Sequence, residues 1–191
     1  KENYMKLILD VENTVTKRDG KMHLDPFEPD NSLVMVGILP VDADAQPRIY
    51  TFDHAQIEPT FNGKEELQLN LDNTTLLIGH NIAYDLLWLW ESGFRYDGEV
   101  YDTMLNEYIL QRGVKQPLTL EACAERCGAT PKSDTLKEYF AKGYSTRDIP
   151  HSELCEYLRA DLLATSDVYH SLMRRYNQAD NAGLRDIAEL T

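Results

Sequence analysis

Residues 75–91 read Thr75-Leu76-Leu77-Ile78-Gly79-His80-Asn81-Ile82-Ala83-Tyr84-Asp85-Leu86-Leu87-Trp88-Leu89-Trp90-Glu91. The apolar run before Gly79 predicts a fully buried strand, and residues 82–91 predict a helix that begins at the end of that strand. Asn81 and Asp85 therefore lie at a strand-to-helix junction. Because functional sites in α/β sheets form at the carboxyl ends of strands, we expect a site here.

The segments before this stretch predict three strands, and the segments after it predict helices. The short breaks between the apolar runs at 6–11, 32–39 and 48–52 indicate an antiparallel meander. Residues 63–71 are ambiguous and fit a short helix. The expected later helices span 102–110, 119–127, 135–142 and about 152–176, with Pro117, Pro131 and Pro150 between them. This order predicts one α/β domain with a partly antiparallel sheet.

Four acidic residues lie on these predicted elements: Asp10, Glu12, Asp85 and Asp161. Asp10 and Glu12 are two residues apart on a strand, so their side chains leave the same face. Tyr157 and Asp161 are four apart on the last helix, about 40° apart around its axis, on one flank of its apolar stripe. Taken singly, Asp10 and Glu12 fit a solvated or turn role as well as a functional one, whereas a surface role is favoured for Asp161. Asp85, one turn into its helix, fits capping or complementation of the helix dipole.

Four carboxylates at one point repel each other unless divalent cations lie between them, and paired cations can cut phosphodiesters. Asp10, Glu12, Asp85 and Asp161 together therefore predict a metal-dependent nuclease.

Three segments match, in order and content, the three motifs of the DEDD exonuclease family in its tyrosine-containing subgroup (DEDDy, DnaQ-like). They are Asp10-Val11-Glu12, Gly79-His80-Asn81-Ile82-Ala83-Tyr84-Asp85 and Tyr157-Leu158-Arg159-Ala160-Asp161. The chain resembles the 3′-5′ proofreading exonuclease domain of family A DNA polymerases. Tyr101–Leu110 is similar to the helix between the second and third motifs, and Leu118–Glu121 resembles the start of the helix that follows.

The resemblance implies an RNase H-like fold, with a mixed, mostly antiparallel-edged sheet flanked by helices. It also implies two divalent cations, Mg²⁺ or Mn²⁺, held by Asp10, Glu12, Asp85 and Asp161. Tyr157 would orient the attacking water, since a phenol with a pKa near ~10 is a poor base at neutral pH. Asn81 and Tyr84 would lie by the substrate's 3′ end, where Tyr84 would stack on a base.

The first motif of the family commonly has Thr between its acids, where this chain has Val11. On a strand the side chain of Val11 points away from the metals, so we expect the change not to impair catalysis.

The implied function is removal of nucleoside 5′-monophosphates from single-stranded or frayed DNA 3′ ends. Residues 1–176 would form the exonuclease domain, and 177–191 a tail or linker to a polymerase domain. RNase D-like enzymes share the tyrosine-type motifs, so an exoribonuclease is one alternative. A catalytically silent exonuclease fold, kept as a binding or structural module, is another.

Bulk properties constrain the partners and the compartment. The net charge of −13 argues against tight, independent binding of duplex DNA, because phosphate binding needs Lys and Arg. No apolar run is long enough to span a membrane. Three cysteines are too few for a disulfide framework, which indicates a reducing, cytoplasmic compartment.

Other conspicuous residues have structural interpretations. We expect Asp102 to cap the helix that follows it, and Trp88 and Trp90 to lie in the core. Cys123 and Cys127 share a helix face but lack a second ligand pair for zinc, so packing is favoured. Residues 131–148 are the least acidic helical stretch near the third motif and are expected to border the DNA strand.

Overall fold

The computed structural model describes residues 5–41, 44, 46–129, 136–178 and 181–188. The strands are β1 (Met5–Asn13), β2 (Thr16–Arg18), β3 (Lys21–His23), β4 (Leu33–Pro40), β5 (Arg48–Thr51), β6 (Thr74–Gly79) and β7 (Glu99–Asp102). The α-helices are α1 (Gly63–Asp72), α2 (Ile82–Glu91), α3 (Thr103–Leu110), α4 (Leu120–Arg126), α5 (Leu136–Ala141), α6 (His151–Tyr176) and α7 (Ala182–Ala188), with a 3₁₀ turn at Thr146–Asp148. In these parts of the chain, no helix is long and apolar enough to cross a membrane.

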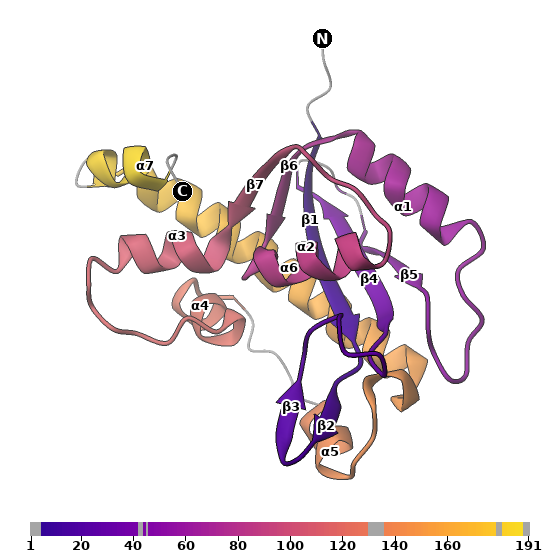
Figure 1. The fold of residues 1–191 in the computed structure, drawn as a ribbon. Helices are drawn as coiled ribbons and strands as arrows, with labels where there is room; N and C mark the ends of the chain where they lie inside the picture. Colours follow the sequence, from indigo (N-terminus) through magenta and orange to yellow (C-terminus); the bar gives the residue numbers. More distant parts are fainter. Residues whose placement is uncertain (1–4, 42–43, 45, 130–135, 179–180, 189–191) are drawn as a thin grey trace.

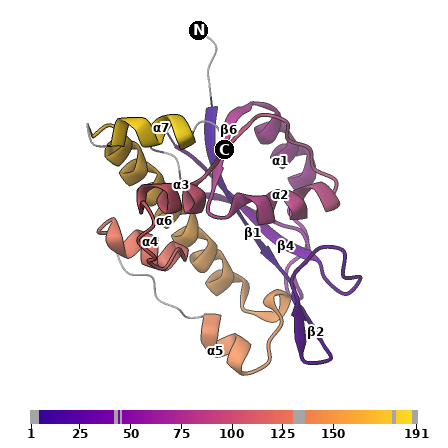
Figure 2. The ribbon, with the colours of Figure 1, turned by 60° about the vertical axis from the view of Figure 1, so that its left-hand side comes forward.

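Five strands form a mixed sheet in the order β5-β4-β1-β6-β7, with helices on both faces (Figures 1 and 2). β1, β4 and β5 pair antiparallel, which confirms the predicted meander. β6 runs parallel to β1 and to β7. The carboxyl ends of β1, β6 and β7 therefore meet at one edge of the sheet, which also confirms the predicted α/β class.

The side chains of β1 alternate between two cores. Leu7, Leu9 and Val11 pack in a cluster that includes residues of α1 and α2, whereas Ile8 packs with Leu162 of α6 on the opposite face. Because strand side chains alternate with a period of two, the later even-numbered residues of β1 also face α6.

The helix α6 lies close against the sheet because β4 carries a glycine where the two cross. A Cβ atom at Gly37 would lie 2.7 Å from Cδ1 of Leu162 and 2.9 Å from Cγ of Leu158, closer than side chains pack. The α6 residues that cross the sheet at this point belong to the apolar stripe predicted from the sequence, which is buried at Leu154, Leu158, Leu162, Thr165, Tyr169 and Leu172.

Several elements differ from the predicted ones. The strand β7 precedes α3, so Asp102 ends a strand as well as capping a helix. Residues 16–23 form the small hairpin β2–β3 around the Asp19-Gly20 turn. Trp88 is buried as expected, but the expectation for Trp90 is wrong: its side chain is 47% exposed, because it lies on the solvent side of the last turn of α2.

Two further regions bear on the expected domain layout. Part of the predicted tail forms α7, whose Leu184 and Ala188 pack against a core cluster built on α3, α4 and α6. Of the segment 131–148, residues 131–135 lie outside the described residues, and the remainder contains α5 and the 3₁₀ turn.

Candidate active site

Three of the predicted acidic residues meet where β1 passes α6. Asp10 and Glu12 leave the face of β1 that α6 covers, and Asp161 comes from α6 itself. A carboxylate oxygen of each lies within 4.8 Å of one from each of the other two. Asp10 and Glu12 are half-buried, whereas Asp161 is buried. Side chains from two elements about 150 residues apart in the sequence thus form one acidic cluster.

Asp85 approaches Asp10 from the helix α2. It lies one turn into α2 and is buried. The backbone N–H of Val11 lies 3.1 Å from Oδ1 of Asp85 and also 3.1 Å from Oδ1 of Asp10, so it serves both carboxylates. Burial, followed by the charge of Asp10, raises the pKa of Asp85 well above its usual value. The surroundings of Asp85 therefore disfavour its charged form as long as no cation lies between the carboxylates.

The donor set fits the cations implied by the sequence. Carboxylate oxygens are the ligands that Mg²⁺ and Mn²⁺ prefer, and a divalent cation offsets the repulsion among them. Asp10, Glu12 and Asp161 are close enough to share one ion. Asp85 is not part of this group of three and lies next to Asp10 through the shared Val11 N–H.

Tyr157 lies one helical turn before Asp161 and is half-buried. Burial, then the charges of Asp161, Glu12 and Asp10, and a hydrogen bond with Asp161, all raise its pKa. The phenol therefore stays protonated at neutral pH. In that state it can donate a hydrogen bond and orient a neighbouring group, but it cannot accept a proton.

Asn81 lies at the junction between β6 and α2 with a left-handed backbone (φ 63°, ψ 43°). It occupies the N-cap position of α2, yet its side chain makes no capping hydrogen bond. Its backbone N–H instead donates to Oδ1 of Asp102 at 3.0 Å. The exposed side chain of Asn81 is therefore left on the surface at the carboxyl end of β6.

Asp102 has the capping role predicted for it. Its Oδ1 accepts hydrogen bonds from the backbone N–H groups of Met104 and Leu105 at the start of α3, in addition to the one from Asn81. One carboxylate oxygen therefore holds the start of α3 against the β6–α2 junction.

Tyr84 is less available for a base than the sequence suggested. Its hydroxyl lies 2.8 Å from Oδ1 of Asn13 and 2.9 Å from the carbonyl oxygen of Leu24, and its ring is half-buried against the α1–α2 core. The ring thus connects α2 to the end of β1 and to the chain just after β3.

Sequence reasoning did not single out His80 and Asn13 as parts of this region. His80 has Nδ1 at 2.9 Å from the hydroxyl of Thr103 and Nε2 at 2.7 Å from the carbonyl oxygen of Leu118, so it ties β6 to α3 and to the loop before α4. Burial lowers its pKa. Asn13, next to Glu12, is the buried partner of Tyr84. Its position directly after the acidic pair was the available signal.

The remaining cysteines and histidines form no metal site in the described residues. Cys123 is buried in the α3–α4–α6 core and Cys127 packs against that core, as the packing interpretation predicted. His151 lies instead at the start of α6, with Nε2 3.0 Å from the hydroxyl of Thr51.

Comparisons with known proteins agree with this geometry. A family model described as 3′-5′ exonuclease matches residues 43–177, a range that holds Asp85, Tyr157 and Asp161. Comparison by sequence with curated proteins gave no match.

Three solved structures illustrate the fold similarity. NrnC of Brucella melitensis with bound Mg²⁺ is 20% identical with a TM-score of 0.64, and NrnC bound to pGG is 19% identical with a TM-score of 0.63; each match covers 99% of this chain and 80% of the other. The family B DNA polymerase of Pyrobaculum calidifontis is 18% identical with a TM-score of 0.60, over 89% of this chain and 24% of that one. At these identities the likeness shows the fold alone, which is the predicted RNase H-like fold with a mixed sheet.

Proposed function

This chain belongs to the 3′-5′ exonuclease family, and from that premise we propose that it removes nucleoside 5′-monophosphates from DNA 3′ ends as a proofreading exonuclease. The observation that carries the proposal is the cluster of Asp10, Glu12 and Asp161 within 4.8 Å, with Asp85 bound beside Asp10. No other feature of the described residues gathers as many metal-ligand oxygens.

The reaction is hydrolysis of the last phosphodiester. The oxygen of a water molecule bonds to phosphorus, the bond from phosphorus to the 3′ oxygen breaks, and that oxygen takes a proton. Two divalent cations held by Asp10, Glu12, Asp85 and Asp161 would activate the water and stabilise the leaving oxygen. Tyr157, whose phenol is protonated at neutral pH, would orient the water through its hydroxyl group. The exposed Asn81 side chain is placed to contact the terminal nucleotide.

The setting proposed for this activity is a DNA polymerase, with a polymerase domain after residue 191. Support comes from the resemblance to polymerase exonuclease domains and from the similarity to part of a family B polymerase. The length of the native open reading frame tests this point. Cys123, Cys127 and Cys155 are free thiols, which fits a reducing compartment such as the cytoplasm.

RNA is the second candidate substrate, because the pGG-bound NrnC structure shares the fold. One experiment separates the candidates: labelled single-stranded DNA and RNA of the same sequence are incubated with Mg²⁺, with EDTA, and with Asp10→Ala. We expect Mg²⁺-dependent shortening of DNA faster than of RNA, and none with the variant. Faster loss of RNA would support an exoribonuclease, and no shortening of either would support a silent module.

A further inference from the structure

The hairpin β2–β3 begins three residues after Asn13, so it extends directly from the acidic end of β1 (Figure 1). Its turn is Asp19-Gly20, with φ of 52° and 76°, the left-handed pair that a tight two-residue hairpin requires. Neither the proposed reaction nor the sheet's core uses this hairpin. It continues the chain from Glu12 and Asn13, so it lies at the same end of β1 as the acidic cluster.

One face of the hairpin is fixed to the segment that follows it. Arg18 donates to Glu28 at 2.8 Å and pairs with Asp30 at 3.2 Å, and Thr16 donates to Asn31 at 2.8 Å. The Tyr84 hydroxyl, 2.9 Å from the carbonyl oxygen of Leu24, holds the end of the hairpin against α2. These contacts hold the hairpin in place relative to the acidic cluster.

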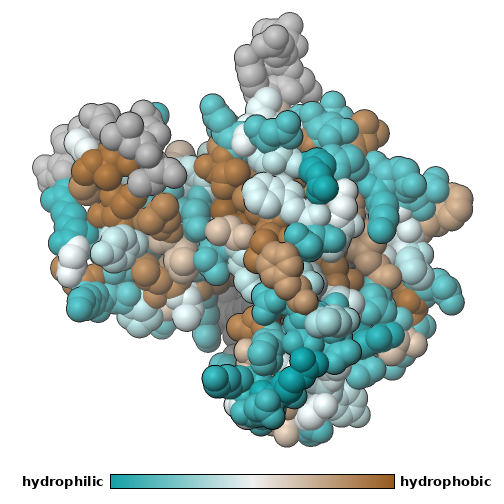
Figure 3. All heavy atoms as spheres, in the orientation of Figure 1, coloured by the Kyte–Doolittle hydropathy of each residue, from teal (hydrophilic) through white to brown (hydrophobic). Residues whose placement is uncertain are grey.

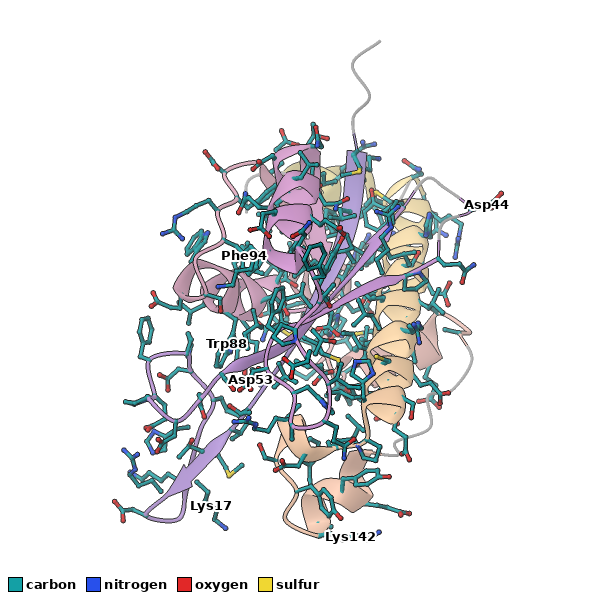
Figure 4. All side chains as sticks on the ribbon, turned by 90° about the vertical axis from the view of Figure 1, so that its right-hand side faces the viewer. Lys17, Asp44, Asp53, Trp88, Phe94 and Lys142 are labelled. Atoms are coloured by element: carbon teal, nitrogen blue, oxygen red, sulfur yellow. The ribbon has the colours of Figure 1, made fainter. Side chains whose placement is uncertain are left out.

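The opposite face presents a cation beside apolar side chains. Lys17 and Met22 are direct cross-strand partners, so both side chains leave the face that Arg18 does not use. Lys17 is exposed, Met22 is 59% exposed, and Leu24 just beyond is 49% exposed. This end of the molecule is mainly hydrophilic in Figure 3. Lys17 and Lys142, which follows α5, both lie there (Figure 4).

The charge of the hairpin contrasts with that of the chain. Residues 16–23 hold three cationic side chains, Lys17, Arg18 and Lys21, against one anionic side chain, whereas the chain carries −13. Of the three, Arg18 is paired with Glu28 and Asp30 on the anchored face. An acidic protein repels a phosphate backbone except where cations are concentrated. Proteins that hold single-stranded nucleic acid combine cations that contact phosphates with side chains, most often aromatic, that pack against the bases. Here exposed Met22 and Leu24 offer an apolar surface beside Lys17.

We propose that the Lys17–Met22 face of the hairpin binds the DNA single strand upstream of its two 3′-terminal nucleotides. Lys17 contacts a phosphate, while Met22 and Leu24 support a base. The inference rests on the proposed function, because it takes the 3′ end to lie at the acidic cluster. The hairpin would then raise the affinity for long substrates, whereas the carboxylates would carry out hydrolysis of the terminal bond.

Binding of a fluorescent twelve-nucleotide single-stranded DNA, followed by anisotropy over a salt series with Ca²⁺ in place of Mg²⁺, tests the proposal. We expect Lys17→Ala to raise Kd about fivefold and to reduce the slope of log Kd against log salt by about 0.7. Lys17→Arg should restore both. Met22→Ala should raise Kd without changing the slope, because it removes no charge.

Lys64→Ala is the matched control, since Lys64 is an exposed lysine on α1, far from the hairpin in Figures 1 and 2. Lys17 and Met22 make none of the anchoring contacts, so the variants should keep the wild-type Tm. A Kd and salt slope for Lys17→Ala equal to wild type, a loss equal to that of Lys64→Ala, or no binding by the wild type would overturn the inference.

The rate of hydrolysis is measured separately from binding. With a dinucleotide, too short to reach the hairpin, we expect Lys17→Ala to turn over at the wild-type rate. A slowed dinucleotide reaction would also contradict the assignment. If the wild type binds the oligonucleotide in a Lys17-dependent way but never cleaves it, the proposed function fails while the hairpin remains a binding surface.

Discussion

Gly37 of β4 lies directly across the sheet from Asp10 of β1, on the face that α6 covers. The absence of a side chain at Gly37 lets Leu158 and Leu162 reach the sheet. Since Tyr157 and Asp161 stand on the same turns of α6, their distance from Asp10 depends on a glycine that takes no part in the chemistry.

Replacing Gly37 by Ala should therefore separate the two halves of the site. The added Cβ would push α6 outward, at a cost of about 1–3 kcal/mol in the free energy of unfolding. We expect exonuclease activity to fall further than stability, because metal ligands tolerate little displacement. Urea unfolding and initial rates measure the two effects.

Gly183→Ala in α7 is the control for that change, because a Cβ there meets nothing within 4 Å. It should leave activity unchanged and stability equal or higher by up to about 1 kcal/mol. Full activity in Gly37→Ala would show that the close approach of α6 is not required.

Asp85→Asn should stabilise the metal-free protein at neutral pH. The pKa of Asp85 is raised in the folded state, so the native protein binds a proton that the unfolded chain releases, and wild-type stability falls as pH rises through the folded pKa. The amide keeps an acceptor for the Val11 N–H but has no charge. Thermal unfolding in EDTA from pH 4 to 8 should show a higher Tm for the variant toward pH 8.

The same variant should lose the rise in Tm that Mg²⁺ gives the wild type, and its activity with it. Asp167→Asn, an exposed change on α6, should behave as wild type in both buffers. An Asp85→Asn protein that is less stable than wild type in EDTA at pH 8 would refute the electrostatic account of this residue.

Tyr157→Phe should lower kcat about 10²-fold, within the range for a lost general acid–base or orienting group. The ring still packs, so stabilisation by Mg²⁺ should persist. Because the ordinary pKa of a phenol, near ~10, already lies well above neutrality and burial raises the pKa of Tyr157 further, no step in the pH–rate profile near neutrality should belong to Tyr157.

The control for the phenylalanine change is Tyr108→Phe, at an exposed position on α3. If the wild type shows an ionisation near neutral pH that the Tyr157→Phe variant lacks, the phenol acts as a base and does not merely orient the water.

The sequence predicted the elements with strong apolar patterns and missed those without them. The β1–β4–β5 meander, β6, α2 and α6 bury continuous apolar runs or stripes. β7 has only four residues, of which Glu99 and Val100 are exposed, so its pairing with β6 alone makes it a strand. The β2–β3 hairpin is polar, and its Asp19-Gly20 turn was the visible signal.

Local spacing explained why Asp10 and Glu12 share a face and why Tyr157 lies with Asp161. That these pairs meet depended on the family resemblance, since nothing local in the sequence brings β1 to α6. The tie from Val11 to Asp85 joins residues 74 positions apart through a backbone N–H, which no residue pattern displays. For Trp90 the local pattern was misleading. Its apolar neighbours suggested a core position, but the residue lies in the last turn of α2 and is exposed.

The most direct test of the acidic cluster is a time course on 5′-labelled single-stranded DNA with Mg²⁺, comparing wild type, Asp161→Asn and Asp167→Asn. We expect stepwise shortening from the 3′ end with release of nucleoside 5′-monophosphates by wild type and Asp167→Asn, and at least a 10²-fold slower reaction by Asp161→Asn. Shortening by Asp161→Asn at the wild-type rate, or internal cuts in place of a ladder from the 3′ end, would contradict it.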